Sequence, residues 1–95
     1  MPVTAPEVSR FDPGAPWALH PQVALRPEGF GALAYHYGNR RLVFLKAPAL
    51  VKVVETLGDF PSAAAAVAAH VPDAQRETYC KALSGLLASD VIRAR

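Results

Sequence analysis

The chain has 95 residues, the length of a single domain, which leaves no room for a second hydrophobic core. Hydrophobic residues make up 52% of it, which is enough for a packed core and too many for a chain that is disordered throughout. The formal net charge is only +2, and the 10 Lys and Arg residues are spread along the chain, whereas nucleic-acid-binding proteins gather such residues into a patch. The composition therefore favours a small globular domain and speaks against a nucleic-acid partner.

The cysteine content and the apolar runs bear on the cellular compartment. The one cysteine, Cys80, excludes an intramolecular disulfide and is typical of a reducing environment. Prolines interrupt the apolar runs near the N-terminus, so no signal-peptide pattern is present. No apolar stretch reaches the roughly 20 residues that span a bilayer. We therefore expect a cytoplasmic protein without membrane contact.

Residues 1–20 are predicted to be a flexible, Pro-rich N-terminal arm, followed by a folded domain over residues 21–95. Each proline removes a backbone donor and biases the residue before it toward extended geometry, so a helix cannot form in the arm. Phe11 and Trp17 are the arm's large apolar side chains. Trp17 either pins the end of the arm onto the domain, which is the commoner role of such a residue, or lines a surface for a partner.

Three strands are predicted next, over Val23–Glu28, Gly31–Tyr37 and Arg41–Lys46. The second strand alternates large side chains with small ones or histidine, as a half-buried strand does. Gly38-Asn39 separates the second strand from the third and predicts a tight hairpin turn, because both residues tolerate positive φ. The third strand contains the run Leu42–Leu45, which predicts apolar side chains on both of its faces.

Three helices are predicted after the strands. The first begins at Pro48, because proline suits the first helical position, and Gly58 is predicted as its C-terminal cap. Ser62 is predicted to cap an Ala-rich second helix that runs to about His70. Asp73 is predicted to cap a third, longer helix.

The third helix carries one apolar face, formed by Tyr79, Leu83, Leu86 and Leu87. Residues 91–95 are too few for a helix and are predicted as a stub of strand. Strands followed by helices indicate the α+β class. A three-stranded antiparallel meander packed on a compact three-helix unit is a winged-helix-like architecture, and we expect this fold.

Residues with the chemistry of an enzyme or a metal site are scarce. His20, His36 and His70 are far apart in the sequence and lack the i, i+4 spacing of a helical metal site. Cys80 is a single thiol, whereas a metal site needs about four ligands. No serine lies in a nucleophile elbow, and the glycines form no phosphate loop. We therefore expect a non-catalytic protein with no metal and no cofactor of its own.

Two binding functions remain open. The third predicted strand can be an uncovered edge of the sheet, where a peptide could add as a further strand and place alternate side chains in a groove against the third helix. The same edge could pair with a second copy and give a homodimer. Alternatively, a winged helix could dock on DNA through the third helix, but Arg76 and Lys81 are offset there by three carboxylates, which suits phosphate neutralisation poorly.

Several segments resemble one known family. The run Trp17–Tyr37, the following Arg40–Lys46 and the helical half from Tyr79 to the Ser89-Asp90-Val91-Ile92 end are similar to the mycofactocin-system peptide chaperones. This family belongs to the recognition elements of pathways for ribosomally synthesised, post-translationally modified peptides, typified by the pyrroloquinoline-quinone peptide chaperone. The strand region is the specific part of the resemblance, whereas the Ala-rich helix is not specific.

The resemblance implies three strands followed by three helices, and a precursor peptide bound as an added strand between the third strand and the third helix. It also implies that the peptide is presented to a radical S-adenosylmethionine maturase, to which the iron–sulfur clusters and the cofactor would belong. The peptide-binding residues expected on this basis are Arg41, Leu42, Val43, Phe44 and Leu45 of the strand and Arg76, Tyr79, Leu83, Leu86 and Leu87 of the helix. The sequence leaves open which of these side chains face the peptide and which face the core.

Overall fold

The structure, a computed structural model, describes residues 11–95, so part of the predicted arm lies outside the described residues. In chain order the strands and α-helices are β1 (Trp17–Leu19), β2 (Val23–Glu28), β3 (Gly31–His36), β4 (Leu42–Leu45), α2 (Pro48–Thr56), α3 (Ala63–His70), α4 (Arg76–Ala88) and β5 (Ile92–Ala94). Short 3-10 helices, Leu57–Asp59 and Asp73–Gln75, precede α3 and α4. The antiparallel meander β2-β3-β4 followed by three α-helices confirms the predicted α+β fold.

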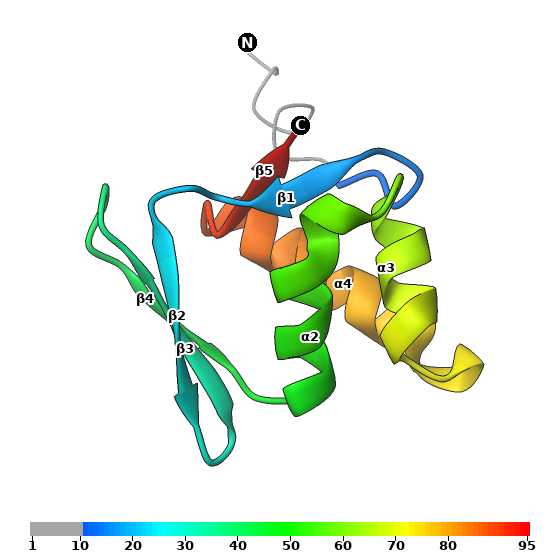
Figure 1. Cartoon of the computed structure of the whole chain (residues 1–95), viewed down its shortest axis with the longest axis horizontal. Helices are drawn as coiled ribbons and strands as arrows, with labels where there is room; N and C mark the ends of the chain where they lie inside the picture. Colours follow the sequence, from blue (N-terminus) through cyan, green and yellow to red (C-terminus); the bar gives the residue numbers. More distant parts are fainter. Residues whose placement is uncertain (1–10) are drawn as a thin grey trace, which may run out of the picture.

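The β2-β3-β4 sheet forms one layer, and the helices cover one of its faces (Figure 1). Side chains alternate along β3 between the two faces of this sheet. Ala32, Ala34 and His36 are buried on the face toward the helices, which we call the inner face. Leu33 and Tyr35 are only half-buried and lie on the opposite, outer face. The small alanine side chains let α2 pack closely against β3.

The hairpin between β3 and β4 lies where the sequence predicts it, but its backbone differs from the expectation. Positive φ falls on Arg40, with φ 63°, and not on Gly38 or Asn39. Space favours glycine at position 38 instead, because a Cβ there would lie 2.8 Å from the His36 ring and 2.6 Å from Oε1 of Gln22. The Gly38 N–H also donates to Nδ1 of His36 at 3.0 Å, a bond that any residue except proline could make. The turn is therefore organised around the His36 side chain.

Two helix starts are confirmed. Pro48 is the first residue of α2, where its missing N–H costs no hydrogen bond. The Oγ of Ser62 accepts a hydrogen bond from the N–H of Ala65 at 3.1 Å and caps α3. Both features depend on local chemistry, which is why the sequence reveals them.

Two other predicted caps are wrong. Gly58 does not end α2, because the chain tightens into the 3-10 helix Leu57–Asp59 instead. Asp73 does not cap α4: it begins a 3-10 turn, and its carboxylate pairs with the guanidinium of Arg76 at 2.7 Å. In both places a 3-10 turn supplies the hydrogen bonds that the predicted cap would have made.

The first and the last strand of the described residues form a second, two-stranded sheet. The predicted strand stub after Val91 is confirmed as β5, which pairs antiparallel with β1 so that Leu19 lies opposite Ile92. Strand β1 falls within the predicted arm, and Trp17 is only 6% exposed, with its indole N–H donating to the carbonyl of Asp12 at 2.7 Å. The last part of the predicted arm therefore belongs to the folded unit.

The hydrophobic core joins both sheets to all three helices. Side chains that are fully buried come from every layer and include Leu45, Val53, Leu57, Leu83 and Ile92. Among residues 11–95, no helix has the length and apolar character needed to cross a membrane. The core thus holds β4, α2 and α4 at fixed positions relative to one another.

Candidate functional site

Strand β4 forms an open edge of the three-stranded sheet. Within residues 11–95 its one neighbouring strand is β3, while β2 forms the opposite edge. Strand β2 contains Pro27, whose missing N–H makes that edge a poor partner for a further strand. The four residues of β4, Leu42–Leu45, include no proline and no charge. Of the two edges, β4 is the one suited to strand addition.

The register identifies which backbone groups β4 presents at this edge. The N–H of His36 donates to the carbonyl of Arg41 at 2.9 Å, so these two residues form a hydrogen-bonded pair. Since such pairs alternate along an antiparallel ladder, Val43 also turns its N–H and C=O toward β3, opposite Ala34. The N–H and C=O groups of Leu42 and Phe44 therefore point away from the sheet, where an added strand would pair with them.

The side chains of β4 divide between the two faces of the sheet. Leu42 and Phe44 lie on the outer face and are each 57% exposed. Val43 is half-buried on the inner face and packs against the core, and Leu45 is fully buried there. Arg41 is exposed at the start of the edge. The free backbone groups thus belong to the two residues whose side chains face outward.

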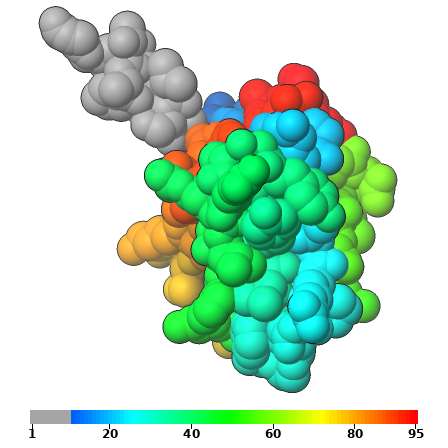
Figure 2. All heavy atoms as spheres, turned by 90° about the vertical axis from the view of Figure 1, so that its left-hand side faces the viewer, coloured from blue at the N-terminus to red at the C-terminus, as the bar shows by residue number. Residues whose placement is uncertain are grey.

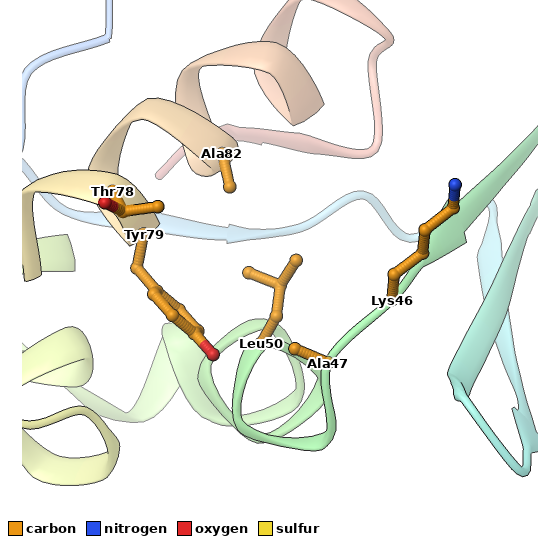
Figure 3. A pocket seen from close by; sticks show the side chains of 6 residues that line it. All are labelled: Lys46, Ala47, Leu50, Thr78, Tyr79 and Ala82. Carbon is orange, nitrogen blue, oxygen red and sulfur yellow. The ribbon is translucent and has the colours of Figure 1, made fainter. Parts of the chain in front are cut away.

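A small hollow lies beside the end of β4, between α2 and α4. Its volume is about 200 Å³, which is smaller than the ~300–1,000 Å³ of typical small-molecule pockets. In Figure 3 the ring of Tyr79 reaches from α4 toward Leu50 of α2, with Ala82 above them and Lys46 at the exit of β4. The lining residues are Lys46, Ala47, Leu50, Thr78, Tyr79 and Ala82. A largely apolar hollow of this size suits one side chain of a peptide.

The predicted residues of α4 have different positions. Leu83 and Leu86 are buried in the core, and Tyr79 and Leu87 are half-buried and pack against it. Arg76 turns toward the α3–α4 connection: its Nε donates to the carbonyl of Val71 at 3.1 Å, in addition to its pairing with Asp73. Of these residues, Tyr79 is the one that lines the hollow.

Sequence reasoning missed most of the residues that line the hollow. Thr78 and Ala82 lie next to Tyr79 and one turn after it, so the helical spacing of α4 could have revealed them. Leu50 is buried on α2, and only the fold, which places it with Tyr79 at the same hollow, connects these two residues. Lys46 was assigned to the end of a strand and not to a groove.

The structure also brings together His20, His36 and Asp90, which are distant in the sequence. The Nε2 of His36 lies 2.9 Å and that of His20 lies 3.6 Å from the same carboxylate oxygen of Asp90. The three ligand atoms lie within 4.8 Å of one another, which raises the question of a metal ion.

The hydrogen bonds on the other ring nitrogens argue against a metal at this cluster. Nδ1 of His36 accepts the N–H groups of Gly38 and Asn39, at 3.0 and 3.2 Å, and Nδ1 of His20 accepts that of Gln22 at 3.0 Å. A neutral histidine that accepts at Nδ1 carries its proton on Nε2, whereas a histidine that binds a metal through Nε2 needs that nitrogen unprotonated and donates from Nδ1. The arrangement fits a His36 Nε2–H that donates to the Asp90 carboxylate at 2.9 Å, with the Nε2 of His20 nearby at 3.6 Å. This hydrogen bond ties β3 to the turn before β5.

The environment of the single thiol, Cys80, disfavours its ionised form. Cys80 is half-buried in α4, and this burial raises the pKa of its thiol, with a further contribution from the negative charge of Glu77. A raised pKa leaves less of the nucleophilic thiolate at neutral pH. Cys80 therefore acts as a small packing residue in α4.

Comparison with known proteins identifies the family. The Peptide chaperone MftB family model matches residues 16–93. The chain belongs to this family. Its relatives include the Peptide chaperone MftB of Mycobacterium tuberculosis (strain ATCC 25618 / H37Rv), which is 49% identical over 85 residues that cover 88% of this chain and 78% of the relative. That of Mycolicibacterium smegmatis (strain ATCC 700084 / mc(2)155) is 47% identical over 93 residues, covering 97% and 91%. No solved structure gives a significant match.

The region shared with the family contains every part of the candidate site. The match begins just before β1 and ends within β5, so it spans the open edge of β4, the hollow and the cluster around Asp90. The mycofactocin-system resemblance seen in the sequence is thereby confirmed.

Proposed function

We propose that this protein is a peptide chaperone that binds the mycofactocin precursor peptide as an added strand on β4 and presents it to a radical S-adenosylmethionine maturase. The observation that carries this proposal is the open edge of β4, whose free backbone groups lie beside an apolar hollow on α4. The name of its relatives, Peptide chaperone MftB, supports the peptide as ligand.

The geometry of β4 divides the peptide's side chains into two sets. Residues of an added strand lie opposite residues of β4 and share their face. Peptide residues opposite Leu42 and Phe44 would form the backbone hydrogen bonds and turn their side chains to the outer face. The residues between them would point to the inner side, next to Val43 and the hollow at Tyr79. We therefore expect an apolar residue at alternate positions of the bound segment.

On this proposal the chain positions the peptide and makes no covalent bonds itself. Holding the peptide raises its local concentration at the maturase and removes part of the entropy cost of their encounter. One strand fills the edge, so a second copy of the chain pairing at β4 would compete with the peptide.

The alternative of a DNA-binding winged helix finds little support in α4. The ammonium of Lys81 lies 4.0 Å from the carboxylate of Glu77, and Arg76 is engaged by Asp73 and by backbone carbonyls. A recognition helix needs cations that are available to phosphates and bases. The two cations of α4 already have partners within the protein.

An amide NMR titration of the labelled protein tests the proposal. With the precursor peptide, we expect shifts concentrated in residues 41–46 and 78–82, and with duplex DNA of the same concentration we expect none. Shifts along α4 with DNA, together with silence toward the peptide, would contradict the proposal.

A further inference from the structure

The outer face of the β2-β3-β4 sheet is apolar and uncovered. The large hydrophobic side chains that stay exposed within residues 11–95 are Phe30, Tyr37, Leu42 and Phe44, and all of them belong to this layer. Figure 2 looks onto it, with residues of β2 to β4 in cyan and green across the view. Exposed apolar side chains gathered on one face are a mark of an interaction site.

The face has a defined shape. A hollow of about 360 Å³ is lined by Ala24, Arg26, Leu33, Tyr35, Tyr37 and Leu42. Two aromatic pairs lie on this layer: the rings of Tyr35 and Tyr37, which line the hollow, meet edge-on with centroids 5.1 Å apart, and the tilted rings of Phe30 and Phe44 have centroids 5.7 Å apart. Side chains that hold one another in this way are preorganised, which lowers the entropy cost of docking.

The charge of this layer indicates the kind of partner. Residues 22–46 contain four cations, Arg26, Arg40, Arg41 and Lys46, and one carboxylate, Glu28, which pairs with Arg26 at 3.3 Å. Residues 47–90 contain three cations and five carboxylates, so the excess of positive charge belongs to the sheet layer. Two copies of the chain docked face to face would bring like charges together, whereas a partner with carboxylates around an apolar centre would be attracted.

We propose that this outer face is a docking site, separate from the peptide groove, for a protein surface with an apolar centre and an acidic rim. The identity of this partner rests on the proposed function, which names the radical S-adenosylmethionine maturase. A peptide added to β4 would place alternate side chains beside Leu42 and Phe44 on the same face. The maturase would then contact chaperone and peptide together, and each would strengthen the binding of the other.

The test uses a variant of the central strand. Leu33→Thr with Tyr35→Thr removes apolar surface from the middle of the outer face, and threonine keeps a high strand propensity. Both residues lie on β3, one strand away from the added peptide. We expect the affinity of this variant for purified maturase, measured by calorimetry, to fall about tenfold or more. The affinity for precursor peptide should stay within about twofold of the wild type, since the edge of β4 is unchanged.

A charge pair supplies the matched control. Arg26 lies on the outer face and Lys52 on α2. Arg26→Glu and Lys52→Glu change the net charge by the same amount. Arg26→Glu should weaken maturase binding and Lys52→Glu should not. A maturase affinity that is unchanged in both the β3 variant and Arg26→Glu overturns the proposal.

A second copy of the chain or a nucleic acid could also occupy the face, and each would give a different experimental result. A wild-type dimer in sedimentation that the β3 variant dissociates would assign the face to a second copy, and binding of a single-stranded oligonucleotide that the variant loses would assign it to nucleic acid. Either result overturns the proposal. If the wild type binds no precursor peptide, the proposed function fails, and this separate titration distinguishes that failure from a wrongly assigned docking face.

Discussion

At Gly31 the backbone adopts φ +149°, a conformation that residues with a side chain rarely take. A Cβ at this position, where β3 begins, would overlap the carbonyl oxygen of Leu45 at the end of β4. The neighbouring Gly29 has no atom within 4 Å of such a Cβ. Of these two glycines, Gly31 is required by the fold, whereas Gly29 leaves space for a side chain.

This contrast predicts different effects of the same substitution. Gly31→Ala should lower the free energy of unfolding by about 1–3 kcal/mol or more, because the backbone strain and the overlap with Leu45 act together. For a domain of this size, each kcal/mol corresponds to about 4–8 °C in Tm. Gly29→Ala, the control, should change Tm little. Equal Tm values for the two variants would show that the turn relaxes without cost.

The environment of Cys80 predicts its pH-dependent reactivity. Burial, and to a smaller extent the negative charge of Glu77, raises the pKa of the thiol. Since the thiolate is the species that reacts, alkylation by iodoacetamide should follow a pH curve displaced to higher pH than that of a free cysteine. Glu77→Gln should move the curve part of the way back, and Glu55→Gln, a control on α2, should leave it in place. A curve that coincides with free cysteine would contradict the assigned burial.

Among the helices and strands, the sequence correctly predicts the boundaries that depend on local chemistry. Pro48 and Ser62 mark helix starts through their own backbone and hydroxyl groups, so both starts were found correctly. Strand β1 was missed because its three residues carry no strand pattern of their own and depend on pairing with β5 at the other end of the chain. Arg40 was missed as the positive-φ residue because the His36 ring, buried by the fold, organises that turn.

The candidate site shows the same division. The edge run Leu42–Leu45 was visible as an apolar strand, yet only the register with β3 shows that Leu42 and Phe44 hold the free backbone groups. The hollow needs Leu50 of α2 and Ala82 of α4 to line one space, and such an arrangement of separate elements leaves no trace in local periodicity. Sequence reasoning therefore located the edge and left the groove beside it undefined.

The packing of α4 gives a direct test of the groove. Ala82→Leu should fill the hollow beside Tyr79 and exclude the peptide side chain that we expect there. Burying one apolar side chain contributes about 1.5–3 kcal/mol to the binding free energy. Losing it should lower the affinity for the precursor peptide at least about tenfold. Ala88→Leu makes the same change on the same helix at an exposed position, and its affinity should stay within about twofold of the wild type. Equal affinities in calorimetry would exclude the hollow as an anchor.

In the molecule as a whole, the layers differ in how far they are buried. The helices and the β1-β5 sheet bury the inner face and supply the core, while the outer face and the edge of β4 remain available to other molecules. A domain of this size buries only about two-thirds of its unfolded surface, so its stability depends on a few large side chains. Trp17 is one of them, and it ties the start of β1 to the core.

Trp17 therefore provides a test of the molecule as a unit. Trp17→Ala should cost about 3–5 kcal/mol, a large share of the ~5–15 kcal/mol that holds a typical domain together. Phe11→Ala removes a half-buried ring whose centroid lies 5.2 Å from that of Trp17. It should lower the free energy of unfolding clearly less than Trp17→Ala does. If the peptide binds only the folded state, adding it should raise the Tm of Trp17→Ala in proportion to the logarithm of its concentration, although Trp17 lies far from β4 in the chain. If Trp17→Ala keeps the wild-type Tm, β1 does not contribute to the stability of the domain. The geometry of the β4 edge would then be set by residues 21–95 alone.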